Sequence, residues 1–169
     1  LALDRIDIDM LVQLRNKLRS VNSRNVVARV VGSDSAHRDE FVVYTAHWDH
    51  FGIGEPVNGD SIYNGAADNA TGTAGLLTLA KAYSAMKTPP KRSILFLAVT
   101  AEEQGLPGSE YYARFPLYPL DRTLANVNVD GMNMWGKTSD VTVVGMGASD
   151  LDDYLSAAAK EQNLMLIPD

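Results

Sequence analysis

The chain has 169 residues, of which 46% are hydrophobic, and its formal net charge at pH 7 is −6. This size suits one domain with a buried core, and the acidic balance leaves no basic surface for nucleic acid or for an anionic membrane. No apolar run is long enough for a transmembrane segment. Because the sequence contains no cysteine, disulfides and thiolate metal sites are excluded, and any metal must be bound by histidine, carboxylate or water.

The first part of the sequence predicts three strands. Apolar and polar residues alternate over 6–18, which is the period of a strand, and the helical alternative matches fewer positions. Two further apolar segments, 25–31 and 41–46, predict strands that are joined by a polar turn over 32–40. The glycine- and asparagine-rich residues 51–67 have no periodic pattern, so we expect a long loop of the kind that is often functional.

The second part alternates helices with strands. Residues 68–85 predict a buried helix, and the continuous apolar run 94–99 predicts a central strand that is covered on both faces. The remaining predicted elements are a short helix over 107–115, strands over 124–129 and 141–144, and a helix over 149–163. We expect no closing element after this last helix. The order of the elements predicts an α/β sandwich with a mixed sheet.

A histidine and a carboxylate follow the predicted strand 41–46. His47 lies at the carboxyl end of this strand, where an imidazole can reach a metal in a crevice. Asp49 is two residues further on, so an extended backbone would point its carboxylate the same way, toward the other nitrogen of the imidazole. An isolated histidine and aspartate at this spacing are more often part of a polar loop. Further acidic residues at other strand ends are needed to favour a metal site.

Four acidic residues follow or precede other predicted elements. Asp68 lies directly before the first predicted helix, where by itself it would be an N-cap. Glu102 and Glu103 follow the central strand, and Asp130 closes the next strand. By themselves, two adjacent glutamates are usually a solvated pair, and Asp130 would be a turn aspartate about as often as not. Because the carboxyl ends of strands meet at one edge of a sheet, we expect all four to converge on His47.

This set of side chains suits a metal centre. Imidazole and carboxylate ligands favour zinc, with manganese or cobalt as substitutes. Carboxylates packed this closely would repel each other without cations between them, and two metals about 3.5–4 Å apart are usual in hydrolases of this kind. A metal lowers the pKa of bound water to about 7, and a carboxylate that is not a ligand can then take its proton. The sequence therefore indicates metal-assisted hydrolysis.

Four ordered motifs resemble those of the M28 family of zinc aminopeptidases. They are residues 46–50 (AHWDH), 64–72 (NGAADNATG), 100–109 (TAEEQGLPGS) and 128–130 (NVD). The resemblance covers residues 24 to 169 and implies a three-layer α/β/α sandwich with a mixed, mostly parallel sheet. It also implies two zinc ions in the complete domain and a peptide as the substrate.

The resemblance assigns a role to each candidate ligand. His47 and Asp130 would bind one zinc, Asp68 would bridge the two ions, and Glu103 would bind the second. Asp49 would orient His47 and so support catalysis.

The resemblance also concerns three residues that lie next to the candidate ligands in the sequence or in the motifs. Glu102 would be the general base. His50 belongs to its motif without being a family ligand, and we expect it to support the loop. The bond between Asp68 and Asn69 would be a non-proline cis peptide, as it is in the family after the bridging aspartate.

One ligand of the family pattern is missing from this sequence. The second zinc of the family takes a histidine from a Ser-Asp-His motif near the carboxyl end, and no histidine follows Asp130 here. The resemblance ends at Asp169, before this motif is due. We therefore expect a fragment, incomplete at its C-terminus, that binds one zinc or none and has negligible peptidase activity by itself.

The resemblance favours an aminopeptidase that hydrolyses the first peptide bond of an unblocked peptide, in the periplasm or outside the cell. A carboxypeptidase or dipeptidase on the same scaffold, a glutaminyl cyclase, and a non-catalytic binding ectodomain are the alternatives. Residues 1–21 would be an extended lead-in strand returning from an inserted protease-associated domain. Residues 22–169 would be the peptidase domain without its C-terminal part.

Overall fold

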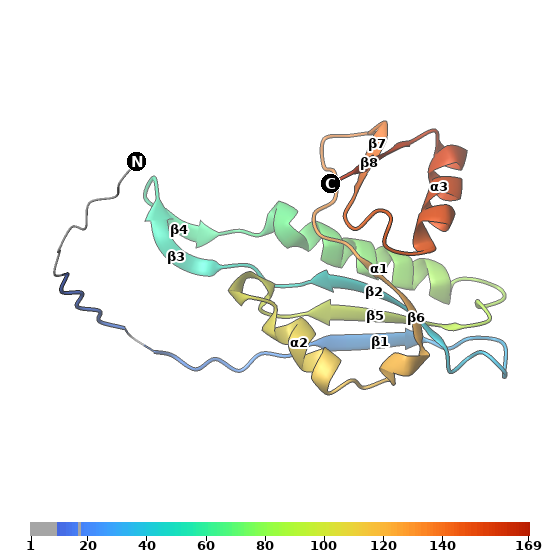
Figure 1. The fold of residues 1–169 in the computed structure, drawn as a ribbon, viewed down its shortest axis with the longest axis horizontal. Coiled ribbons are helices and arrows are strands. Elements are labelled where there is room, and N and C mark those ends of the chain that lie inside the picture. The colour runs from blue at the N-terminus through green and yellow to red at the C-terminus, as the bar shows by residue number, and fades with distance from the viewer. Residues whose placement is uncertain (1–9, 17) are drawn as a thin grey trace, which may run out of the picture.

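The structure is a computed structural model that describes residues 10–16 and 18–169 (Figure 1). Its strands are β1 (Val26–Val30), β2 (Phe41–His47), β3 (Gly52–Val57), β4 (Asp60–Tyr63), β5 (Ser93–Val99), β6 (Thr123–Asn128), β7 (Asp140–Val143) and β8 (Met165–Pro168). Its α-helices are α1 (Thr71–Ser84), α2 (Pro107–Arg114) and α3 (Leu151–Gln162). Short helical turns lie at Ala66–Ala70, Glu102–Gln104 and Leu120–Arg122. No helix in the described residues has the length and apolarity needed to cross a membrane.

The central sheet has four strands in the order β1-β5-β2-β6. Strand β2 pairs in parallel with both β5 and β6, whereas β1 runs antiparallel to β5. The pairing places His47 opposite Val99, so that β2 and β5 end at the same level. The predicted mixed, mostly parallel sheet is confirmed, and β5 is the buried inner strand that the apolar run 94–99 predicts.

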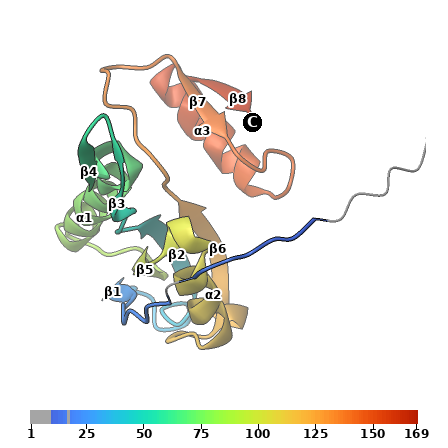
Figure 2. The same ribbon diagram turned by 90° about the vertical axis from the view of Figure 1, so that its left-hand side faces the viewer.

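Two apolar clusters cover opposite faces of this sheet, because alternate residues of a strand point to opposite sides. One cluster lies on the side of α2 and consists of Phe41, Val43, Leu95, Leu97 and Val99, with Tyr112 of α2 packed against it. The other lies on the side of α1 and consists of Ala46, Leu76, Ile94 and Phe96. Figure 2 shows α1 and α2 on opposite sides of the sheet. The three-layer α/β/α sandwich is therefore confirmed.

The segment 51–67 contains a β-hairpin, so the expectation of a loop there was wrong. Strands β3 and β4 pair antiparallel, and Asn58 and Gly59 form the turn with φ angles of 53° and 87°. An Asn-Gly turn with two positive φ angles is a strong hairpin pattern. All residues of β3 are exposed, and this is why the segment lacks the apolar alternation of a half-buried strand.

The last part of the chain forms a small unit from β7, α3 and β8. Strands β7 and β8 pair in parallel, with α3 between them in sequence. The predicted strand and helix are present, but the expectation that no element follows the helix was wrong. The apolar residues Met165, Leu166 and Ile167 pair with β7, and the short run had too few residues to show a period.

The strand predicted over 6–18 is absent from the part of it that the structure describes. Residues 10–16 and 18–25 lie in no helix or strand, and the chain before residue 23 extends away from the sheet in the described part (Figures 1 and 2). Leu14 and Leu18 are 79% and 93% exposed. Alternation satisfies the period of a strand but supplies no partner for its backbone hydrogen bonds. Residues 1–9 and 17 lie outside the described residues, and the domain division at residues 21 and 22 stays a prediction.

Candidate metal centre

The candidate site lies where β2, β5 and β6 end. His47 is the last residue of β2, Glu103 lies in the turn after β5, and Asp130 follows β6. Asp68 comes from the turn before α1. Ligand atoms of His47, Asp68 and Glu103 all lie within 4.8 Å of one another. A carboxylate oxygen of Asp130 lies 3.2 Å from the imidazole of His47, so the structure brings the four predicted ligands together.

His47 presents one nitrogen to this cluster. Its Nδ1 lies 2.8 Å from the backbone carbonyl oxygen of Asp49, and because a carbonyl only accepts, Nδ1 carries a proton. Its Nε2 lies 2.9 Å from Oδ1 of Asp68 and 3.2 Å from Oδ1 of Asp130. Burial lowers the pKa of His47, but the Asp49 carbonyl and the two carboxylates raise it by more, so that the pKa lies above its ordinary value. The surroundings of Nε2 therefore favour a positive charge.

The carboxylate of Asp49 does not hold His47, contrary to the expectation from the spacing. It accepts hydrogen bonds from the Ala101 N–H at 2.7 and 2.9 Å and from the Thr100 hydroxyl at 2.7 Å. Strand β2 ends at His47, so the extended backbone that would align the two side chains does not continue to residue 49. The carbonyl of Asp49 orients the imidazole, and its carboxylate fixes the turn that leads to the two glutamates.

Asp68 and Asn69 form the turn that precedes α1. The peptide bond between them is cis, as the resemblance implied. The Asn69 side chain is 2% exposed; its amide donates to the Val129 carbonyl at 2.9 Å, and its oxygen accepts from the N–H groups of Gly72 at 2.9 Å and Gly131 at 3.1 Å. Asn69, and not Asp68, thus accepts a hydrogen bond from the first turn of α1, and it joins this turn to the loop of Asp130. The sequence contained no feature that would have separated Asn69 from an ordinary cap.

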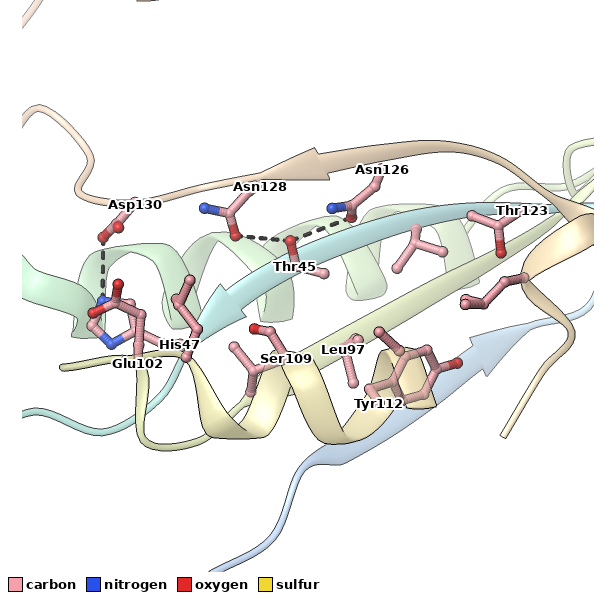
Figure 3. A pocket seen from close by; sticks show the side chains of 15 residues that line it. Thr45, His47, Leu97, Glu102, Ser109, Tyr112, Thr123, Asn126, Asn128 and Asp130 are labelled. Atoms are coloured by element: carbon pink, nitrogen blue, oxygen red, sulfur yellow. Dashed lines mark hydrogen bonds and ion pairs between the residues drawn. The ribbon is translucent and has the colours of Figure 1, made fainter. Parts of the chain in front are cut away.

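The two neighbouring glutamates point to different parts of the site. Glu102 lines a cavity together with His47 and Asp130, and Figure 3 shows it beside the imidazole. Oε1 of Glu103 lies 2.5 Å from Nδ1 of His50, which is 3.9 Å from Oδ2 of Asp68. Nδ1 of His50 and Oε1 of Glu103 are not oriented to form a hydrogen bond with each other. In the described part of the chain, they are the two buried side-chain nitrogen or oxygen atoms that lack a hydrogen-bond partner.

The donor chemistry of the site fits a metal ion. Three carboxylates gather around two imidazoles, and like charges at this spacing need a cation to offset their repulsion. Two buried polar atoms lack a hydrogen bond, and a metal ion would give both a partner. Asp68 and Asp130 remain about half exposed, which leaves the site open to a ligand from solvent.

A cavity of about 350 Å³ extends from the site between β2, β6 and α2. His47, Glu102 and Asp130 form its polar end (Figure 3). The apolar side chains of Val43 and Leu97 line the part farther along the strands. Imidazole and carboxylate groups at the edge of an α/β sheet, beside a largely apolar cavity, are typical of metal-dependent hydrolases.

Comparisons with known proteins agree with this class. The sequence model of peptidase family M28 matches residues 25–169. A probable zinc metalloprotease of Pyrenophora teres f. teres is 37% identical over 133 residues, which are 73% of this chain and 25% of that protein. Aminopeptidase NAALADL1 of Rattus norvegicus is 30% identical over 155 residues, which are 89% of this chain and 18% of that protein. The structure of BSAP, a zinc aminopeptidase from Bacillus subtilis, matches with a TM-score of 0.64 and 28% identity, over 85% of this chain and 34% of that one.

The chain belongs to peptidase family M28, which confirms the resemblance found in the sequence. It spans only 25% and 18% of the length of the two relatives named above.

Proposed function

We propose that this chain carries the metal centre of a zinc-dependent exopeptidase, an aminopeptidase, with two metal ions. His47 and Asp130 would hold the first ion, Asp68 would bridge the two, and Glu103 would hold the second. The observation that carries the proposal is the position of Nε2 of His47, 2.9 and 3.2 Å from carboxylate oxygens of Asp68 and Asp130. Its lone pair is directed there because Nδ1 donates its proton to a carbonyl.

Glu102 is proposed as the general base. When bound, zinc supplies Lewis-acid chemistry, which polarises the scissile carbonyl and lowers the pKa of water. Glu102 lies on the cavity wall next to His47 and Asp130, where it can take a proton from the attacking water and pass it to the leaving amine. The carbonyl and carboxylate of Asp49 support this arrangement by fixing the imidazole and the turn that carries Glu102.

Two features support cleavage at the amino end of a peptide, and a third concerns the side chain. The acidic residues around the cavity mouth attract the terminal ammonium of an unblocked peptide. NAALADL1 and BSAP are both named as aminopeptidases. The largely apolar cavity walls formed by Val43, Leu97 and Tyr112 suit a non-polar side chain next to the scissile bond.

The test replaces Glu102 by Gln, which keeps the shape of the side chain and removes the base. Zinc content, measured by mass spectrometry, should stay near that of the unchanged protein, whereas turnover of a leucine anilide should fall by about 10²–10⁴-fold. Turnover is measured in the longest available form of the protein, because the chain spans a quarter or less of the Pyrenophora metalloprotease and of NAALADL1.

Blocking the substrate provides the control for the type of peptidase. An acetylated leucine anilide should not be hydrolysed, and a peptide with a blocked carboxyl end should be. Equal loss of zinc and turnover in Glu102→Gln would instead make Glu102 a metal ligand and contradict the proposed role.

A further inference from the structure

The loop that carries Glu102 and Glu103 has a strained backbone at both ends. It comprises residues 101–106, between the end of β5 and the start of α2, and we call it the glutamate loop. Ala101 has a φ angle of 58° and Leu106 has one of 65°, so a residue with a side chain adopts the left-handed conformation at each end. Such residues keep this conformation only where neighbouring groups enforce it. The glutamate loop therefore depends on contacts at its two ends.

The side chain of Asn25 joins these two ends. Its oxygen accepts a hydrogen bond from the Thr100 N–H at 3.1 Å, and its amide donates to the Gly108 carbonyl at 2.7 Å. Thr100 and Gly108 also bind each other, because the Gly108 N–H donates to the Thr100 carbonyl at 3.1 Å. Asn25 directly precedes β1. One side chain from this position thus holds together the residue before the glutamate loop and the first turn of α2.

The three residues of this junction are closely packed. A Cβ atom on Gly108 would lie 2.7 Å from Oδ1 of Asn25 and closer still to the carbonyl oxygen of Thr100, so that only glycine fits there. Thr100 is buried and Asn25 is half-buried. The hydrogen bonds of Asn25 are therefore partly shielded from water, and the close packing limits the ways in which the backbone could shift to replace them.

Ser23 makes a second contact to the same end of the loop. Its Oγ lies 2.6 Å from the hydroxyl oxygen of Thr100, which in turn donates to the carboxylate of Asp49 at 2.7 Å. The hydroxyl of Thr100 has one proton and an ionised carboxylate only accepts, so Ser23 is the donor to Thr100. Ser23 and Asn25 thus hold Thr100 from the segment before β1, while Asp49 holds it from the loop after β2.

Asn25 has no place in the cavity that contains the proposed general base. Glu102 lines the cavity of about 350 Å³, and neither Asn25 nor Thr100 does. Both line a different cavity, of about 490 Å³, together with Tyr111 of α2. An effect of Asn25 on a reaction in the first cavity must therefore pass through the glutamate loop.

We propose that Asn25 is a positioning residue for Glu102. This inference rests on the proposed function, in which Glu102 is the general base, and deepens it. By holding the two ends of the glutamate loop together, Asn25 keeps the strained backbone in place and the carboxylate of Glu102 at the polar end of the first cavity. Without the Asn25 amide the loop relaxes, and the base moves away from the attacking water.

The kinetic test compares Asn25→Ala with Asn22→Ala in the longest available form of the protein, with zinc in excess. Turnover of a leucine anilide should fall by about 10–100-fold in Asn25→Ala, while KM should change by less than about threefold. KM is kept because Glu102 transfers a proton and does not bind the substrate. Asn22 is exposed and lies outside every helix and strand, so Asn22→Ala should retain full turnover.

A spin label measures the order of the glutamate loop without any reaction. The chain has no cysteine, so Gln104→Cys provides a single attachment point on an exposed residue of this loop. In the metal-free protein, the EPR spectrum of the label should show greater mobility when Asn25→Ala is added, and no change when Asn22→Ala is added. A label at Lys81→Cys, on an exposed position of α1, reports general loss of structure and should respond to neither.

The possible outcomes separate this inference from the proposed function. A more mobile loop label with lower kcat and unchanged KM supports the inference. An unchanged loop label, unchanged turnover, or a mobile label at Lys81 in Asn25→Ala overturns it. If circular dichroism shows that Asn25→Ala does not fold, Ser23→Ala replaces it, with smaller changes in the same directions expected because it removes one hydrogen bond to Thr100. Full turnover in Glu102→Gln instead refutes the proposed role of the base, and the label alone then decides whether Asn25 orders the loop.

Discussion

Replacing Asn69 by alanine should weaken the fold and the metal centre together. Asn69 is buried, and its amide group makes three hydrogen bonds, one to the Val129 carbonyl and two from the N–H groups of Gly72 and Gly131. In Asn69→Ala these three backbone groups lose their partner at once. The Gly72 N–H is buried, whereas the Val129 and Gly131 groups are partly buried, so water can replace only part of what is lost.

The size of the effect follows from these three bonds. A hydrogen bond of this kind contributes a net free energy of about 0.5–1.5 kcal/mol, and a buried group left unpaired costs more than the bond itself gained. The Val129 and Gly131 bonds are only partly buried and count less than the buried Gly72 bond. We expect the free energy of unfolding to fall by about 2–4 kcal/mol, a large part of the roughly 5–15 kcal/mol that domains have.

The assay is urea unfolding followed by circular dichroism, with zinc affinity measured on the folded protein. Asn69 is next to Asp68 in sequence, and its bonds to Val129 and Gly131 flank Asp130, so the metal ligands should separate and zinc affinity should fall as well. The control is Asn64→Ala. Asn64 is exposed, its single side-chain contact is 3.5 Å long, and the unfolding free energy should change by less than about 0.5 kcal/mol.

Asn69→Asp tests the amide N–H donor of Asn69 separately from its oxygen acceptor. It keeps an oxygen for Gly72 and Gly131 but places a second oxygen against the Val129 carbonyl, 2.9 Å away. The folded protein should therefore favour the protonated carboxyl and raise its pKa, so that this variant loses stability as the pH rises above about 4. An unfolding free energy of Asn69→Ala within about 0.5 kcal/mol of the unchanged protein would refute the reasoning.

Two further predictions concern Asp49 and Tyr44. Asp49→Ala removes the acceptor for the Ala101 N–H and the Thr100 hydroxyl, so zinc affinity measured by titration should fall by about 10–100-fold. Asp49→Asn keeps an acceptor and should lose less affinity. Equal affinity in Asp49→Ala and the unchanged protein would contradict this. Burial and the hydrogen bond to Tyr83 raise the pKa of Tyr44 to about 12, so the folded protein keeps a proton that the unfolded chain loses near pH 10, and stability should fall between about pH 10 and 12. Absorbance titration at alkaline pH should show one phenol that ionises at a higher pH than the exposed tyrosines. Tyr83→Phe should lower the pKa of Tyr44, while burial keeps it above 10. If Tyr44 ionises together with the exposed tyrosines, its burial and its hydrogen bond to Tyr83 are contradicted.

The positions of the proposed metal ligands could be predicted from the sequence because each follows a strand or precedes a helix with a clear apolar pattern. The apolar residues of strand β5 form an uninterrupted run, and strand β2 ends at His47. The carboxyl ends of both strands could therefore be predicted from the sequence. Side-chain directions beyond the strand ends could not be predicted in the same way. The carboxylate of Asp49 turns toward Ala101, because the regular alternation of a strand stops at His47.

Other features depend on contacts that no periodicity records. The hairpin of β3 and β4 is exposed on both faces, so only its Asn58-Gly59 turn could have indicated it. Strand β8 exists because its backbone pairs with β7, which the short run of residues 165–168 does not reveal. The approach of His50 to Glu103 is a tertiary contact between loops 53 residues apart in the numbering, after β2 and after β5.

Two polar side chains outside the proposed ligand set, the half-buried Asp49 and the buried Asn69, link the four segments of the site in pairs. Asp49 joins the loop after β2 to the turn after β5, and Asn69 joins the turn before α1 to the loop after β6. Each link uses backbone N–H groups, so it fixes the path of the chain and not only a side chain. The carboxylates of Asp68 and Asp130 are thereby held close together by the folded protein before any ion arrives. In the proposed metal site an ion would find its ligands in place, and its binding would relieve a repulsion that the fold itself creates.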